Sequence, residues 1–112
     1  MIKINPDTLD ACIIKGDVGT INISNNIREF TDGDIVKLVV DKVYDQETPD
    51  ILIEVDTFNE DGTATINIQP SDTEDLEIGV YRYNIVWVDN GKPNTLTMGD
   101  CEIPKFEIKP GV

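Results

Sequence analysis

Apolar and polar residues alternate with a period of two along much of the chain. In residues 63–69 the even-numbered positions are apolar and the odd-numbered positions are polar, and residues 19–24 repeat the pattern. This alternation is typical of a β-strand that has one buried face. Alternation, or an enrichment in β-branched and aromatic residues, predicts further strands at residues 35–44, 51–58, 81–88 and 95–108. Gly99 and Pro104 interrupt the last of these, which indicates one long or broken strand with an edge position or a bulge.

The most aromatic of these segments places Tyr81, Tyr83, Ile85 and Trp87 on one face. We expect this face to build the core, and an exposed aromatic platform for sugar stacking is the alternative. Tyr81 lies just inside its strand, after a glycine. Immunoglobulin-like domains place a tyrosine corner at this position, and its hydroxyl group hydrogen-bonds to upstream backbone.

Two residue pairs predict β-hairpins. Asn90–Gly91 suits both central positions of a type I′ turn, so we expect a hairpin between Val88 and roughly Thr95, with a loop lengthened by Lys92–Pro93. Asp61–Gly62 is expected to join the two strands that flank it in the same way.

About seven short strands in 112 residues predict an all-β, immunoglobulin-like, two-sheet antiparallel Greek-key sandwich. At most one short helical turn is expected, near residues 71–76, because Ser71–Glu74 fits a capping box. The length suits a single domain spanning residues 1–112. Within it, residues 1–10 are expected to form an N-terminal arm and residues 109–112 a linker-like tail.

The charge narrows the choice of partners. The chain carries 22 acidic and 9 basic residues, for a net charge of −13. Such a charge repels the phosphate backbone of nucleic acids and anionic lipid head groups, so we expect neither as a partner. Solubility explains the acidity on its own, and attraction to cations or to a basic partner is the alternative. The apolar runs are too short to cross a membrane, and the N-terminus lacks the apolar region of a signal peptide.

The residue types argue against catalysis. The chain contains no histidine, which removes the commonest general base and the commonest transition-metal ligand. Nearly all Asp and Glu residues fall at predicted turns or on the polar sides of strands, which does not suit a paired-carboxylate site in a cleft. We therefore expect no enzyme, no catalytic residues and no cofactor.

Calcium is the strongest alternative as a ligand, because several loops carry clustered oxygen donors. The nearest approach to an EF-hand loop begins at Thr57 instead of Asp and has Ile68 at its twelfth position, so that motif fails. Asp is also an ordinary turn residue, and we expect no metal site. The weak candidates for Ca²⁺ are Asp32, Asp34, Asp45, Asp50 and Asp61.

Cys12 and Cys101 are the two cysteines of the chain. The first and last strands of such a sandwich can be neighbours, so a bridge between these residues is conceivable. Without a signal peptide, reduced thiols that behave as small buried apolar groups are the preferred interpretation. Two thiols alone do not make a zinc site, which takes four ligands.

Four segments resemble one protein family. They are Gly16–Ile23, the connection Ser71–Leu76, the strand Gly79–Ile85 and the final segment Gly99–Pro110. Together they are similar to the immunoglobulin-like module at the N-terminus of phage upper baseplate proteins and to related short prophage tail proteins of Gram-positive bacteria. The family pattern ends in a strand that reads Gly-x-Phe-x-Ile. In this chain several extra residues, including Pro104, lie between Gly99 and Phe106. The resemblance covers roughly residues 14–110.

The resemblance implies a non-catalytic structural module of a phage or prophage tail or baseplate, which acts by protein–protein contacts. Its expected partners are other tail or baseplate proteins or further copies of itself. Its expected location is the bacterial cytoplasm during synthesis and the virion tail afterwards. The alternative is a surface immunoglobulin-like module that binds carbohydrate or another ligand, with or without a loop Ca²⁺. Whether the chain is complete or is the first domain of a longer protein stays open.

Overall fold

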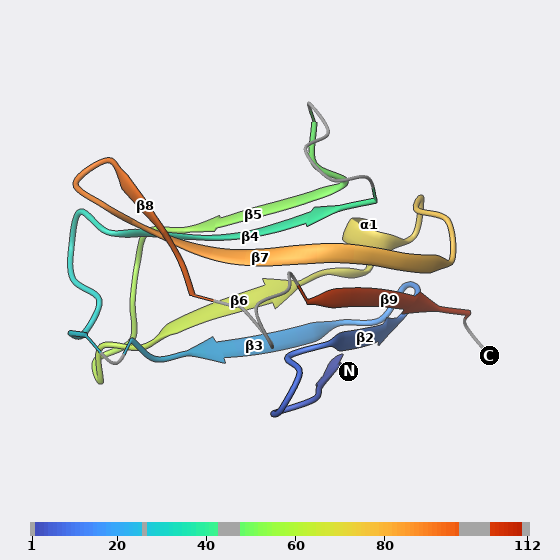
Figure 1. Ribbon diagram of the computed structural model, residues 1–112, viewed down its shortest axis with the longest axis horizontal. Coiled ribbons are helices and arrows are strands. Elements are labelled where there is room, and N and C mark those ends of the chain that lie inside the picture. Colours follow the sequence, from blue (N-terminus) through green and yellow to red (C-terminus); the bar gives the residue numbers. More distant parts are fainter. Residues whose placement is uncertain (1, 26, 43–47, 97–103, 111–112) are drawn as a thin grey trace.

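The computed structural model describes residues 2–25, 27–42, 48–96 and 104–110. Nine strands and one helical turn lie in these ranges (Figure 1). They are β1 (Ile2–Ile4), β2 (Ala11–Ile14), β3 (Gly19–Ile23), β4 (Ile35–Asp41), β5 (Ile51–Val55), β6 (Ala64–Ile68), α1 (Pro70–Thr73), β7 (Gly79–Asp89), β8 (Lys92–Thr95) and β9 (Lys105–Lys109). The prediction of a mostly-β chain with one short helical turn is confirmed. The strands outnumber the predicted seven, partly because β1 lies in the segment expected to be an N-terminal arm.

Seven strands form one mixed sheet. Its order is β1-β2-β9-β7-β4-β5, and β8 pairs with β7 as well. β2 and β9 are parallel, whereas the other neighbours in this sheet are antiparallel. The prediction of purely antiparallel sheets is therefore wrong at this pair. The two strands come from opposite ends of the chain, and the long connection between them permits the parallel direction that a tight hairpin would forbid.

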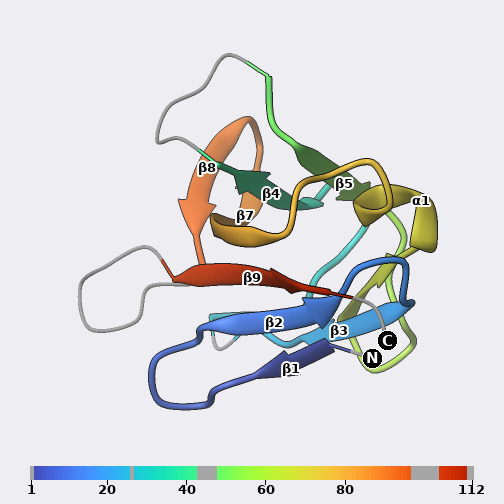
Figure 2. The ribbon, with the colours of Figure 1, turned by 90° about the vertical axis from the view of Figure 1, so that its right-hand side faces the viewer.

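β3 and β6 form a separate antiparallel sheet. Figure 2 shows β3 beside the larger sheet. The apolar residues of β3 and β6, which the alternation predicted, form one core with those of the larger sheet. The small sheet contributes Ile21, Ala64, Ile66 and Ile68, all less than 7% exposed. The larger sheet contributes buried residues from β2, β4, β5, β7 and β9.

β7 carries the aromatic part of the core, as predicted. Tyr81, Tyr83, Ile85 and Trp87 are 2–3% exposed, so this face builds the core and is not an exposed platform. The hydroxyl group of Tyr81 donates a 2.8 Å hydrogen bond to the carbonyl oxygen of Glu77. The predicted bond from a corner tyrosine to upstream backbone is therefore confirmed.

The Asn90–Gly91 hairpin is confirmed in position and corrected in length. Both residues have positive φ, 50° and 79°, as a type I′ turn requires. Lys92 and Pro93 do not lengthen the loop, because they already pair with β7 as part of β8. Pro93 is tolerated there because β8 lies at the edge of the sheet.

The hairpin predicted at Asp61–Gly62 is wrong. The turn exists, since the Gly62 N–H donates to the Asn59 carbonyl and Gly62 has a φ of +80°. However, β5 pairs with β4, and β6 pairs with β3, so residues 56–63 cross from one sheet to the other. Strand alternation and turn residues are the same in a hairpin and in a crossover between layers, so the sequence pattern did not separate them.

The helical turn begins earlier than predicted. Gln69, and not Ser71, is its N-cap residue, and the Asp72 carboxylate accepts the Gln69 N–H at 2.7 Å. Pro70 occupies the first helical position, where its missing N–H costs nothing.

The strand predicted at residues 95–108 is described at its two ends, with Thr95 in β8 and residues 105–108 in β9. β8 and β9 lie one after the other along the same edge of β7, with the Tyr83 N–H donating to the Pro104 carbonyl where β9 begins. Gly99 and the rest of the predicted interruption lie outside the described residues, apart from Pro104.

Candidate interaction surface

The outer face of β1, β2, β9 and β7 brings together residues from both ends of the chain. In β9, Phe106 and Ile108 are fully buried, while the three residues that alternate with them are exposed. Paired residues of neighbouring strands point to the same face of a sheet. The register therefore places eight residues on the outer face, here called the basic face: Lys3, Cys12, Ile14, Val80, Arg82, Lys105, Glu107 and Lys109.

The charge of the basic face is opposite to that of the whole chain. It holds four of the nine basic residues and a single carboxylate, that of Glu107, although the chain carries 22 acidic residues. Among the ion pairs of the described residues, none involves Lys3, Lys105 or Lys109. The face is thus a positively charged surface on a strongly negative protein.

The basic face also exposes apolar side chains. Val80 is 52% exposed and Ile14 is 36% exposed, on either side of β9. Ile78, which directly precedes β7, is 53% exposed. Apolar side chains with charged neighbours are the usual composition of a surface that contacts another protein.

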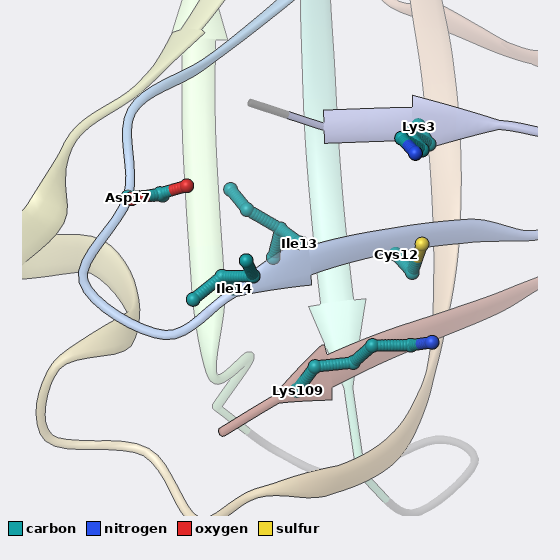
Figure 3. Close-up of a pocket in the computed structure, with 6 residues that line it drawn as sticks. All are labelled: Lys3, Cys12, Ile13, Ile14, Asp17 and Lys109. Carbon is teal, nitrogen blue, oxygen red and sulfur yellow. The ribbon is translucent and has the colours of Figure 1, made fainter. Parts of the chain in front are cut away.

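A shallow hollow of about 240 Å³ lies at the β1–β2 side of the basic face (Figure 3). It is lined by Lys3, Cys12, Ile13, Ile14, Asp17 and Lys109. Figure 3 shows the half-buried Cys12 between the side chains of Lys3 and Lys109. A hollow of this size is smaller than the roughly 300–1,000 Å³ of sites for drug-sized ligands, so it is better suited to a side chain of a docked protein.

Cys12 carries a free thiol. It lies in β2, the second strand, next to Glu107 of β9, the last strand. Cys101, the other cysteine, lies outside the described residues, so neither the bridge nor the preferred pair of reduced thiols is tested for it.

The sequence analysis did not identify the basic face, although one signal was present. In residues 105–109, charged side chains alternate with Phe106 and Ile108, which marks an exposed charged face. The pairing of β9 with both β2 and β7 could not be inferred from this alternation, and it is this pairing that adds Lys3 and Arg82.

The most elaborate side-chain network of the described residues surrounds Asp34. This residue is 3% exposed, and its carboxylate accepts bonds of 2.7 and 2.8 Å from Arg28, 2.8 Å from the Thr31 N–H and 3.1 Å from the Trp87 indole. The Arg28 guanidinium lies 4.9 Å above the Trp87 ring. The hydrogen bonds from Arg28 hold the pKa of Asp34 well below its ordinary value. The same bonds raise the pKa of Arg28.

This network ties the β3–β4 connection to the end of β7. Both oxygens of Asp34 are occupied by donors, so the carboxylate is held in its charged form and is poorly placed to exchange protons with a substrate. We therefore assign it a structural role. No sequence signal pointed to it, because Arg28 and Trp87 are far apart in the chain.

The other calcium candidates lie apart in the fold. Asp32 is exposed, and Asp50 accepts a backbone N–H at 2.9 Å. Asp61 accepts the N–H and the hydroxyl group of Thr63, and these bonds lower the pKa of Asp61. Asp45 lies outside the described residues. Within the described ranges, no three Asp, Glu, Cys or His side chains gather closely enough to hold a metal ion.

A second hollow, of about 340 Å³, lies beside β5 and β6. It is lined by Glu54, Val55, Asp56, Thr57, Phe58, Asn59, Thr65 and Asn67. A ladder of neutral polar side chains fixes one wall. The Asn59 amide donates to Thr63 and Thr65 at 3.0 and 2.9 Å, and the Thr65 hydroxyl donates to the Asn22 amide oxygen at 3.0 Å.

In the part of the chain that the structure describes, no helix has the length and hydropathy needed to cross a membrane. Comparison of the chain with protein-family models, with curated proteins and with solved structures finds no match.

Proposed function

We propose that this chain is a non-catalytic assembly module of a phage or prophage tail or baseplate, which acts by protein–protein contacts. The observation that carries the proposal is the basic face. A broad sheet face that exposes apolar and charged side chains suits a contact with another macromolecule better than turnover of a substrate.

An immunoglobulin-like Greek-key sandwich is part of the proposal. In that fold one sheet contains strands G, F and C, with C′ added in variable-type domains, and the other contains B and E. The order β9-β7-β4-β5 and the pair β3-β6 correspond to these two groups. The bond from Tyr81 to the Glu77 carbonyl, on the strand equivalent to F, supports the same assignment.

The place in a tail or baseplate rests on the resemblance of four chain segments to that family. Three of them coincide with described elements: Gly16–Ile23 contains β3, Ser71–Leu76 contains most of α1, and Gly79–Ile85 forms most of β7. They form the turns and the core, so they support the module type more strongly than its location. The non-catalytic role is supported by the absence of histidine from the sequence.

The location is tested on purified particles. Phage or tail-like particles are induced from the host strain, banded on a density gradient and analysed by quantitative mass spectrometry. We expect peptides of this chain to co-purify with the particle proteins at a fixed ratio across the gradient. Its presence only in the soluble fraction, at normal expression, would contradict the proposal.

A second candidate is a carbohydrate-binding module, favoured by the hollow beside β5 and β6. The Asn59 amide and the Thr65 hydroxyl group, which hydrogen bonds hold in place, line this hollow together with the apolar Phe58, and such groups are suited to neutral polyhydroxylated ligands. Titration of the protein with cell-wall oligosaccharides, followed by its thermal midpoint, tests this candidate, because a ligand specific to the folded state raises that midpoint. The same measurement with Ca²⁺ tests the proposed loop ion.

A further inference from the structure

We propose that the basic face binds the acidic β5–β6 side of a second copy of this chain, so that copies associate head to tail. This inference rests on the proposed assembly function, and it names the partner of the basic face.

The acidic side is defined by exposed residues of β5 and of the crossover to β6. They are Leu52, Glu54, Asp56, Glu60 and Asp61. The sequence contains no Lys or Arg from residue 43 to residue 81, and this stretch holds eleven of the 22 acidic residues. One side of the fold is thus strongly negative, with Lys37, paired to Glu54 at 3.8 Å, as a nearby cation.

The basic face and the acidic side lie towards opposite edges of the larger sheet. β5 is the edge strand of the larger sheet, and β4 and β7 lie between it and β9. The register places Leu52 and Glu54 on the same face of this sheet as the basic face, at the β5 edge. One copy can therefore present its basic face to one neighbour and its acidic side to another.

Local charge decides this contact more than the net charge of −13 does. The shortest dimension of the molecule is 27 Å, whereas the Debye length at 0.1 M salt is about 10 Å. Carboxylates on the far side of each copy are therefore screened from the contact, and lysines of the basic face interact mainly with the carboxylates that they touch. Repulsion from the total charge becomes important only at much lower ionic strength.

Both surfaces also offer apolar area for a contact. Val80 and Ile14 are exposed on the basic face, and Leu52 is 50% exposed on the acidic side. Charge complementarity provides the orientation, and burial of these side chains adds affinity. A contact between two different surfaces is heterologous, so repeating it produces open chains or closed rings and not a two-fold dimer.

Sedimentation velocity of the full chain tests the inference. From about 10 µM to about 1 mM protein in 0.1 M salt, we expect the weight-average sedimentation coefficient to rise with concentration. It should fall back towards the monomer value in 1 M salt, where the Debye length is about 3 Å. A chain that stays monomeric over the whole range overturns the inference. It leaves the proposed function intact, because that function is judged separately by the presence of the chain in particles.

Charge reversal identifies the two surfaces. Lys105→Glu with Lys109→Glu should weaken association at least about tenfold, and so should Glu54→Lys with Glu60→Lys. Lys92→Glu, compared with Lys105→Glu alone, is the matched control, because both change the net charge by the same amount and Lys92, in β8, lies outside both surfaces. We expect it to change association by less than about twofold. An equal loss in this control overturns the inference, since the effect would then come from net charge.

Mixing the two defective proteins separates head-to-tail contact from other arrangements. The lysine-reversed chain keeps its acidic side, and the glutamate-reversed chain keeps its basic face. An equimolar mixture should form dimers and stop there, because only one productive contact remains. In a Cys101→Ser background, the rate at which Cys12 of the glutamate-reversed chain reacts with a maleimide should fall in those dimers, since its basic face forms the contact. Cys12 of the lysine-reversed chain should keep its rate. A mixture that stays monomeric, or that forms longer assemblies, overturns the head-to-tail arrangement.

Discussion

The guanidinium group of Arg28 donates two parallel hydrogen bonds, of 2.7 and 2.8 Å, to the carboxylate of Asp34. One partner is nearly fully buried, whereas the Arg28 side chain is 37% exposed. Bidentate pairs of this kind are strong and directional, and removing one partner leaves a buried charge without its counterion. The pair fixes the connection between β3 and β4 against Trp87, on the opposite side of the core from α1 and the β2–β3 turn (Figure 1).

Asp34→Asn should destabilise the fold in a pH-dependent manner. Pairing lowers the pKa of Asp34 in the folded chain, whereas the unfolded chain keeps the ordinary value of about 4. The stabilisation is therefore complete above about pH 4 and is lost as the pH falls towards the folded pKa. We expect the difference in the free energy of unfolding between wild type and Asp34→Asn to be largest near neutral pH and to shrink from about pH 4 to about pH 2. Urea denaturation at several pH values measures it, and a constant difference would contradict the assignment.

Tyr83 should make the wild-type fold sensitive to alkali. Burial raises the pKa of Tyr83 to about 12, from 10 in the unfolded chain. The unfolded chain therefore loses the proton first, and the fold loses up to about 1.4 kcal/mol per pH unit between these values. Tyr83→Phe removes the hydroxyl group, which donates to the Leu9 carbonyl, and should cost about 1–2 kcal/mol at pH 8. We expect the difference in the free energy of unfolding between wild type and Tyr83→Phe, measured by urea denaturation, to narrow above pH 10. Other titrating groups are common to both proteins and cancel in the comparison.

Tyr81→Phe should cost about 1 kcal/mol, the net contribution of one intramolecular hydrogen bond. The ring stays in the core, and only the bond to the Glu77 carbonyl is lost. Chemical denaturation should show a lower midpoint with an unchanged slope, because the surface exposed on unfolding is the same. An unchanged midpoint would mean that the corner bond adds nothing to the stability of the fold.

The predictable features of this fold are those that depend on local pattern. Alternation and β-branched composition located most of the strands that build the core, and the sequence around Tyr81 located the corner bond, because each follows from the residues of a single segment. Asn90–Gly91 located its turn for the same reason. The strand β2 was not predicted, although its Ala11 and Ile13 are buried in the core. The alternation could not show which strands become neighbours, so it missed the parallel β2–β9 pair.

The candidate surface was missed for the same physical reason. Lys3 and Lys105 are at opposite ends of the chain, and only the pairing of β1, β2 and β9 brings them to one face. The charge total of −13 concealed this separation of charge. Two signals in the sequence pointed towards it: the stretch without Lys or Arg at residues 43–81, and the charged residues that alternate with Phe106 and Ile108.

Gly62 constrains the position of the crossover between β5 and β6 as well as the conformation of its own turn. A comparison of alanine variants at Gly62 and Gly91 tests this. Gly62 and Gly91 have nearly the same positive φ, 80° and 79°, so alanine is strained at both. They differ in surroundings. A Cβ atom at Gly62 would lie 2.4 Å from the Cβ atom of Glu29, whereas nothing lies within 4 Å at Gly91. The Phe30 N–H also donates to the Gly62 carbonyl at 3.0 Å, so the crossover is held against the β3–β4 connection.

Gly91→Ala should therefore cost about 1 kcal/mol, the strain of the backbone conformation alone. Gly62→Ala should cost about 1–3 kcal/mol more, because the clash with the base of the Glu29 side chain can be relieved only by moving backbone. Differential scanning calorimetry of the two variants measures the difference. Equal losses would show that the close approach of Glu29 to Gly62 does not constrain the crossover, and that the two turns differ only in the strands that they join.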